Sequence, residues 1–73
     1  MTEGTVARRL VAPGSKSERE AVVLESEEGD LILRREGGNP FRDPELERLV
    51  GRRIRAQGRR HGQTLVMSEW EEI

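Results

Sequence analysis

Short apolar runs separated by turn-forming residues predict a chain of five β-strands. The runs are rich in β-branched residues, and the alternation is clearest where Ile54 and Ala56 interleave with Arg53 and Arg55. Glycine and proline lie between the runs, which is typical of turns. The strands are expected at residues 5–11, 20–26, 31–35, 52–57 and 63–70, and the short connections at 27–30 and 58–62 predict two hairpins.

One short helix is expected between the third and fourth strands. Asp43 is a good N-cap residue, and Pro44 then falls at the first helical position, where its missing N–H is not needed. Apolar residues at positions 46, 49 and 50 are spaced to share one helical face. Gly51 supplies a left-handed stop, so the pattern predicts a helix of about two turns.

The apolar face of each element predicts the core. Val6 and Leu10 share one face of the first strand while Val11 lies on the other, and a β-bulge would reconcile them. A single domain is expected over residues 1–73, with fraying at 1–4 and 71–73. The expected core consists of Val6, Leu10, Val22, Leu24, Leu31, Leu33, Leu46, Leu49, Ile54, Ala56, Leu65 and Met67, with Val66 as a further candidate.

The order of three strands, one helix and two strands is that of the oligonucleotide/oligosaccharide-binding (OB) barrel. Residues 49–58, with a glycine after the helix and another ending the strand, are similar to the passage from helix to fourth strand in OB domains. Residues 62–67 resemble the start of their last strand. The chain thus resembles small stand-alone OB-fold-like bacterial proteins of no assigned function. The resemblance implies an all-β fold with one short helix, a five-stranded OB-like barrel, and it implies no activity.

The chain departs from the OB domains that bind nucleic acid. Those domains stack bases on aromatic side chains of the second and third strands. Residues 20–35 contain no aromatic residue, and the only aromatics are Phe41 and Trp70. Trp70 is a candidate partner contact, with capping of the core as the alternative. Phe41 is expected to staple the entry to the helix.

Composition narrows the classes of protein. The 73 residues contain no cysteine, which excludes a disulfide scaffold, a thiolate nucleophile and sulfur-ligated zinc. The composition of 33% hydrophobic and 37% charged residues is compatible with a disordered chain. The clustered periodic runs favour a folded domain instead. The apolar runs at 21–24 and 31–33 are too short to span a membrane, and no apolar signal segment follows Met1. A cytoplasmic protein without membrane contact is therefore expected.

Charge is distributed unevenly along the chain. Residues 1–30 carry four basic and seven acidic groups (−3), residues 31–60 carry nine and four (+5), and residues 61–73 carry none and three (−3), which gives the net charge of −1. Alternation places Arg53 and Arg55 on the side of their strand away from the core, whereas Arg34 and Arg35 point to opposite faces. The candidate anion-binding or nucleic-acid-binding face consists of Arg34, Arg53, Arg55, Arg59 and Arg60. The alternative is that these arginines pair with glutamates of neighbouring strands, namely Glu20, Glu25, Glu69 and Glu71.

No catalytic constellation is visible in the sequence. Lys16 and Ser17 follow a glycine turn, but a phosphate-binding loop would need its first glycine where Arg9 stands. His61 is the only histidine, and the acidic run at 25–30 lacks the spacing of a calcium loop. Because no nucleophile, base and orienting group can be assembled, we expect neither an enzyme nor a metal or other cofactor.

Two functions remain from the sequence. The first is a non-catalytic binding or interaction module for a protein partner or for self-association. The alternative is binding of single-stranded DNA or RNA through the arginine-rich face, which the missing aromatics oppose. The salt dependence of binding distinguishes these two functions, because contacts with phosphates weaken steeply as the salt concentration rises.

Overall fold

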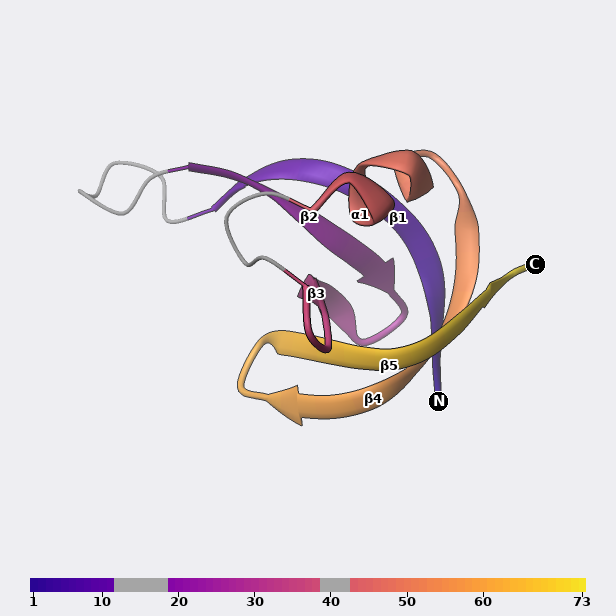
Figure 1. The fold of residues 1–73 in the computed structure, drawn as a ribbon. Coiled ribbons are helices and arrows are strands. Elements are labelled where there is room, and N and C mark those ends of the chain that lie inside the picture. Colours follow the sequence, from indigo (N-terminus) through magenta and orange to yellow (C-terminus); the bar gives the residue numbers. More distant parts are fainter. Residues whose placement is uncertain (12–18, 39–42) are drawn as a thin grey trace.

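The computed structural model describes residues 1–11, 19–38 and 43–73 of the chain (Figure 1). The predicted order of three strands, one helix and two strands is confirmed. The predicted turn at residues 12–15 lies outside the described residues, as do Lys16, Ser17 and Phe41. The elements are β1 (Thr2–Val11), β2 (Arg19–Ser26), β3 (Gly29–Arg35), α1 (Pro44–Leu49), β4 (Arg53–His61) and β5 (Thr64–Glu72).

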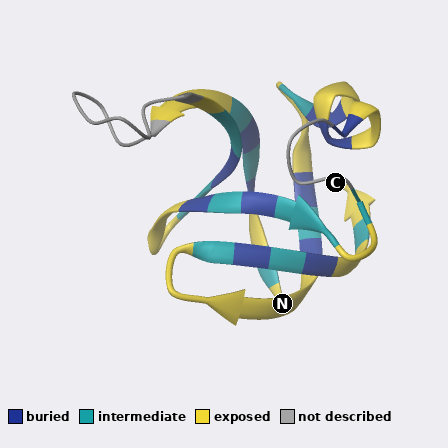
Figure 2. Ribbon diagram, turned by 60° about the vertical axis from the view of Figure 1, so that its left-hand side comes forward, coloured by how far each residue is buried: buried dark blue, intermediate teal, exposed yellow. Residues whose placement is uncertain are grey.

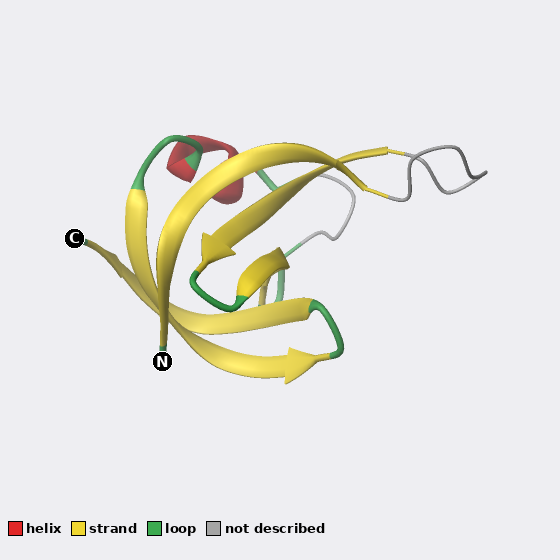
Figure 3. Ribbon diagram, turned by 180° about the vertical axis from the view of Figure 1, so that it is seen from behind, coloured by secondary structure: helices red, strands yellow, loops and turns green. Residues whose placement is uncertain are grey.

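The five strands close into a ring in the order β1-β2-β3-β5-β4, with β4 pairing back to β1 (Figures 1 and 3). All neighbouring strands are antiparallel except β3 and β5, which run parallel. The parallel pair requires a crossover connection, and the segment containing α1 and β4 provides it. None of the described residues belongs to a helix long and apolar enough to cross a membrane.

Both ends of the chain lie in strands, so the predicted strand boundaries were too narrow. β1 begins at Thr2, which pairs with Ala56, and β5 continues to Glu72, which pairs with Ile54. The Ile73 N–H also donates to the Arg53 carbonyl at 2.9 Å. Thr2 and Ala56 are 54 positions apart, and Ile54 and Glu72 are 18 apart, so these pairings have no local signal in the sequence.

The predicted bulge in the first strand was wrong. β1 and β2 keep one register from Gly4 opposite Ser26 to the end of the hairpin. The irregularity lies instead between β4 and β5, at Gln57 and Gly58. A Cβ atom on Gly58 would lie 2.0 Å from the Val66 carbonyl oxygen, so only glycine permits this close approach of the two backbones.

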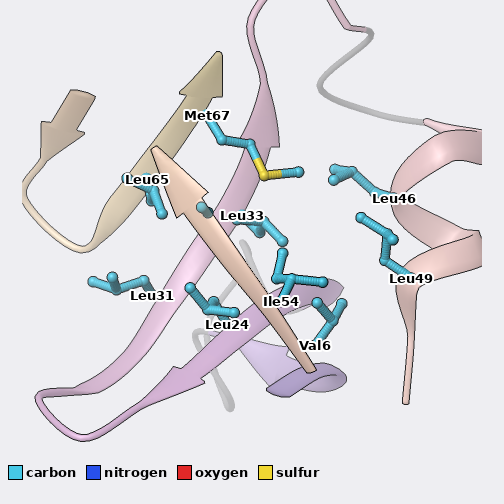
Figure 4. Close-up of a cluster of buried hydrophobic side chains, with 10 residues drawn as sticks. Val6, Leu24, Leu31, Leu33, Leu46, Leu49, Ile54, Leu65 and Met67 are labelled. Atoms are coloured by element: carbon cyan, nitrogen blue, oxygen red, sulfur yellow. The ribbon is translucent and has the colours of Figure 1, made fainter. Parts of the chain in front are cut away.

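The core fills the ring and is closed by α1 (Figure 4). Its largest fully buried side chains belong to Val6, Leu24, Ile54 and Met67. The prediction is confirmed for these residues and for Leu31, Leu33, Leu46, Leu49, Ala56 and Leu65.

Leu10 is a correction to the predicted core, whereas Val22 lies at its margin. Leu10 is 51% exposed, although it has the alternation of a core residue, and Val22 is partly buried and packs against the core. β1 pairs with β4 only up to Thr5, and β2 pairs with β3 only from Val23 onward. Leu10 and Val22 therefore lie where the β1–β2 hairpin extends beyond the ring, and Figure 2 shows the end of this extension as exposed. Val66 is half-buried on the outer side of β5.

The helix forms as its local signals predicted. The Asp43 carboxylate accepts a hydrogen bond from the Glu45 N–H at 3.1 Å, and Pro44 follows as the first helical residue. Gly51 has φ +88°, and with Val50 at φ −56° and ψ 127° it forms the centre of a type II turn. The turn is closed by the Arg52 N–H, which donates to the Leu49 carbonyl at 2.8 Å.

Candidate functional site

Arginine–glutamate pairs cover much of the surface of the described residues. Cross-strand neighbours of opposite charge account for several of them, as in the row where Arg55 lies between Glu3 and Glu71. Seven arginines have a carboxylate partner: Arg8 (Glu20 and Glu47), Arg9 (Glu25), Arg35 (Asp43), Arg48 (Glu45), Arg52 (Glu72), Arg55 (Glu3 and Glu71) and Arg60 (Glu28).

Two of the predicted site residues, Arg55 and Arg60, form such ion pairs. The Arg55 guanidinium lies 3.3 Å from a Glu3 oxygen and 3.1 Å from a Glu71 oxygen. The Arg60 guanidinium lies 2.8 Å from Glu28, in the turn between β2 and β3. Pairing with neighbouring glutamates, the alternative that the sequence left open, thus describes these two arginines.

Arg34 and Arg59 flank Val66 on the outer side of the sheet. Arg34 of β3 is opposite Val66 of β5, and Arg59 of β4 is opposite the same residue. Neither guanidinium has a carboxylate within 4.0 Å among residues 1–11, 19–38 and 43–73. Neighbouring strands are about 4.8 Å apart, so the two arginine backbones are separated by roughly 10 Å across Val66. We call Arg34, Val66 and Arg59 the arginine row.

Arg53 lies apart from this row. It is exposed at the start of β4, opposite Thr5 of β1, and it also has no carboxylate partner within the described part of the chain. The five predicted arginines therefore do not form one stripe. The structure separates them into two paired residues, one isolated residue and the two that flank Val66.

A second cross-strand row lies beside the arginine row and is aliphatic. Ala7 is opposite Val23, Val23 is opposite Ile32, and Ile32 is opposite Thr64. Because side chains alternate along a strand and Val6, Leu24 and Leu33 point into the core, this row points outward. We call Ala7, Val23 and Ile32 the aliphatic row. The sequence did not indicate this row, because alternation placed Val22 and Leu24 in the core and gave no sign of which side chains lie next to Val23 on the outer face.

Arg35 joins the helix to the last strand. Its Nε and Nη2 each donate to a different oxygen of Asp43 at 2.9 Å, and its guanidinium carbon lies 6.0 Å from the centre of the Trp70 ring. Trp70 is partly buried and packs against the core. This environment supports its role as a cap of the core, while a contact of its exposed part with a partner stays a prediction.

The Arg35–Asp43 pair shifts the titration of both groups. The hydrogen bonds from Arg35 lower the pKa of the Asp43 carboxyl, the cap bond from the Glu45 N–H lowers it further, and burial opposes them. The same side-chain hydrogen bonds raise the pKa of the Arg35 guanidinium. Asp43 is 6% exposed and is the N-cap of α1, so a single carboxylate both caps the helix and fixes Arg35.

The described residues contain no group of three histidine, cysteine, aspartate or glutamate side chains placed to hold a metal ion. His61 is exposed at the end of β4. The outer surface of the sheet places arginines beside aliphatic side chains.

No family model matches this chain, and neither the curated proteins nor the solved structures include a significant match.

Proposed function

We propose that this chain is a small non-catalytic binding module of the OB type that holds a protein partner on the outer face of its sheet. The strand order β1-β2-β3-β5-β4, with the helix between the third and fourth strands, supports the OB assignment. Such domains bind ligands on the outside of the ring of strands. A partner would therefore bind at the arginine row and the aliphatic row.

The observation that carries the proposal is the lack of a carboxylate partner at two neighbouring arginines, Arg34 and Arg59. Seven other arginines of the described surface pair with carboxylates of this chain and Arg53 lies apart, whereas the Arg34 and Arg59 guanidiniums flank Val66 with no carboxylate within 4.0 Å in the described part of the chain. Arg34 is half-buried, and a partly desolvated charge without a counter-charge costs free energy. A partner that brings a carboxylate beside an aliphatic side chain would satisfy both the guanidinium and the apolar surface.

A protein fits this surface better than a nucleic acid. Arginine and aliphatic groups without lysine are typical of protein interfaces. Acidic residues adjoin the arginines, since Glu36 and Glu69 line a shallow depression beside Arg59. Binding of single-stranded nucleic acid also relies on aromatic side chains, and no aromatic side chain lies on β2 or β3 to stack a base.

Single-stranded nucleic acid is the second candidate. Arg34 and Arg59, which have no carboxylate partner among the described residues, favour it, because phosphate is the other group that a planar guanidinium binds with two hydrogen bonds. It requires that binding weakens steeply with salt, as counterion release dictates.

Replacing both Arg34 and Arg59 by glutamate tests the proposal. A short peptide of alternating glutamate and leucine serves as the probe, and its affinity is measured by fluorescence anisotropy. We expect the double variant to bind about tenfold or more weakly, because two attractive charges become repulsive. Arg48→Glu is the matched control, since the Arg48 side chain is 76% exposed on α1, which closes the end of the ring and is not part of the outer face of the sheet, and it should bind within about twofold of wild type.

Equal affinity of the double variant and wild type would contradict the proposal. Oligothymidylate is measured in parallel at low and moderate salt. If it binds through Arg34 and Arg59 and the glutamate–leucine peptide does not, the nucleic-acid candidate replaces the protein partner.

A further inference from the structure

Val23 is buried although its side chain points to the outer face of the sheet and not into the core. It is only 2% exposed, yet its neighbour Leu24 points into the core and Val23 is not part of the core cluster. Its cross-strand neighbours Ala7 and Ile32 are both partly exposed. Something on the outer face of the sheet must therefore cover Val23.

The Arg9–Glu25 ion pair supplies that cover. Arg9 is opposite Ala21 and Glu25 is opposite Thr5, so the pair crosses diagonally over the position where Ala7 faces Val23. The Arg9 Nε donates to Glu25 Oε2 at 3.1 Å, and its Nη2 contacts the same oxygen. Four residues of strand span about 13 Å, which the two side chains bridge only by lying flat along the sheet.

The cover is held weakly. The side chains of Arg9 and Glu25 are 53% and 32% exposed, and ion pairs that are open to water contribute little to stability. Because more than half of the Arg9 side chain is exposed, a carboxylate from outside can reach it and replace Glu25. The aliphatic stem of Arg9 also provides cover that can swing aside, since long charged side chains adapt to the surface beneath them.

Uncovering Val23 would complete the site. β1 and β3 run in the same direction on either side of β2. Arg9 follows Ala7 by two residues on β1, and Arg34 follows Ile32 by two residues on β3, so both arginines lie on the same side of the aliphatic row, as does Arg59 beside Val66. Three arginines would border Ala7, Val23 and Ile32 once Glu25 is displaced.

We propose that Glu25 occupies, in the free protein, the position at Arg9 that a carboxylate of the partner takes in the complex. On binding, the partner's carboxylate takes the place of Glu25 at Arg9, and an aliphatic side chain of the partner packs on Val23. This inference rests on the proposed function, and it adds that the partner is an acidic and aliphatic protein segment that competes with the chain's own glutamate. The free protein thus keeps its apolar contact surface covered.

Glu25→Gln tests the inference because glutamine keeps the length of the side chain and loses its charge. We expect the glutamate–leucine peptide to bind about three- to tenfold more tightly to this variant, since Arg9 is released and Val23 is uncovered. Glu28→Gln is the matched control: it makes the same change of net charge and releases Arg60, which lies away from the aliphatic row. The control should bind within about twofold of wild type.

A second measurement does not depend on the peptide. Anilinonaphthalene sulfonate, an apolar probe with one negative charge, should show stronger fluorescence with Glu25→Gln than with Glu28→Gln. Equal fluorescence of the two variants would overturn the inference. If Glu25→Gln leaves peptide affinity unchanged while the Arg34 and Arg59 double variant weakens it, the inference is wrong and the proposed function stands. If neither variant alters binding, both are wrong.

Discussion

Leu24→Ala is expected to leave the protein largely unfolded at 25 °C. Leu24 is fully buried and lies opposite Val6 at the centre of the ring. Removing a buried leucine side chain typically costs about 2–5 kcal/mol, because apolar transfer free energy is lost and a cavity remains. A domain of this size has a free energy of unfolding of only about 3–5 kcal/mol, so one such substitution consumes most of it. Urea unfolding followed by circular dichroism measures the change.

Leu10→Ala is the control for that prediction. Both leucines have the alternation of core residues in the sequence, but Leu10 is 51% exposed on the hairpin extension. Its replacement should change the free energy of unfolding by no more than about 0.5 kcal/mol. Comparable losses for Leu10 and Leu24 would show that the hairpin extension folds back onto the core, contrary to the fold described above.

Asp43→Ala is expected to destabilise the protein by about 2 kcal/mol at neutral pH. The substitution removes the N-cap of α1 and the carboxylate that holds Arg35. Asp43→Asn keeps a capping side chain and loses only the charge. We expect it to lower the free energy of unfolding by about 1 kcal/mol, because solvent screens part of the attraction between Asp43 and Arg35. Unfolding monitored by Trp70 fluorescence measures both, since the indole lies beside Arg35.

The pH dependence of this effect has a definite sign. The folded pKa of Asp43 is lower than its ordinary value of 3.8, so the unfolded chain binds the proton more readily. The stabilisation is complete above the unfolded pKa and is lost as the pH falls through the folded one. The difference between wild type and Asp43→Asn should therefore shrink as the pH falls below about 4. A difference that stays constant down to pH 2 would contradict the ion pair as its cause.

The helix was predictable because its signals are local. Asp43, Pro44 and Gly51 each act within a few residues, and the structure uses them as the cap, the first helical residue and the turn. The exposure of Leu10 and the burial of Val23 were not predictable, because the first depends on where the hairpin leaves the ring and the second on what lies over the outer face of β2. Alternation tells which side of a strand a residue faces, but not whether anything lies on that side.

The candidate site was predictable only in part. The sequence indicated an arginine-rich face, and Arg34 and Arg59 were among the residues it named. It could not separate them from Arg55, since Glu3 and Glu71 become neighbours of Arg55 only when β4 pairs with β1 and β5. The aliphatic row is likewise assembled from three strands, so no stretch of sequence contains it.

The most direct test of the outer-face site is an amide NMR titration of the labelled protein with the glutamate–leucine peptide. We expect chemical-shift changes at the amides of the arginine row, of the aliphatic row and of Arg9. We expect no such changes when lysine replaces glutamate in the peptide. Shifts confined to the exposed part of Trp70 and its neighbour Glu69, or an unchanged spectrum at saturating peptide, would contradict the outer-face site.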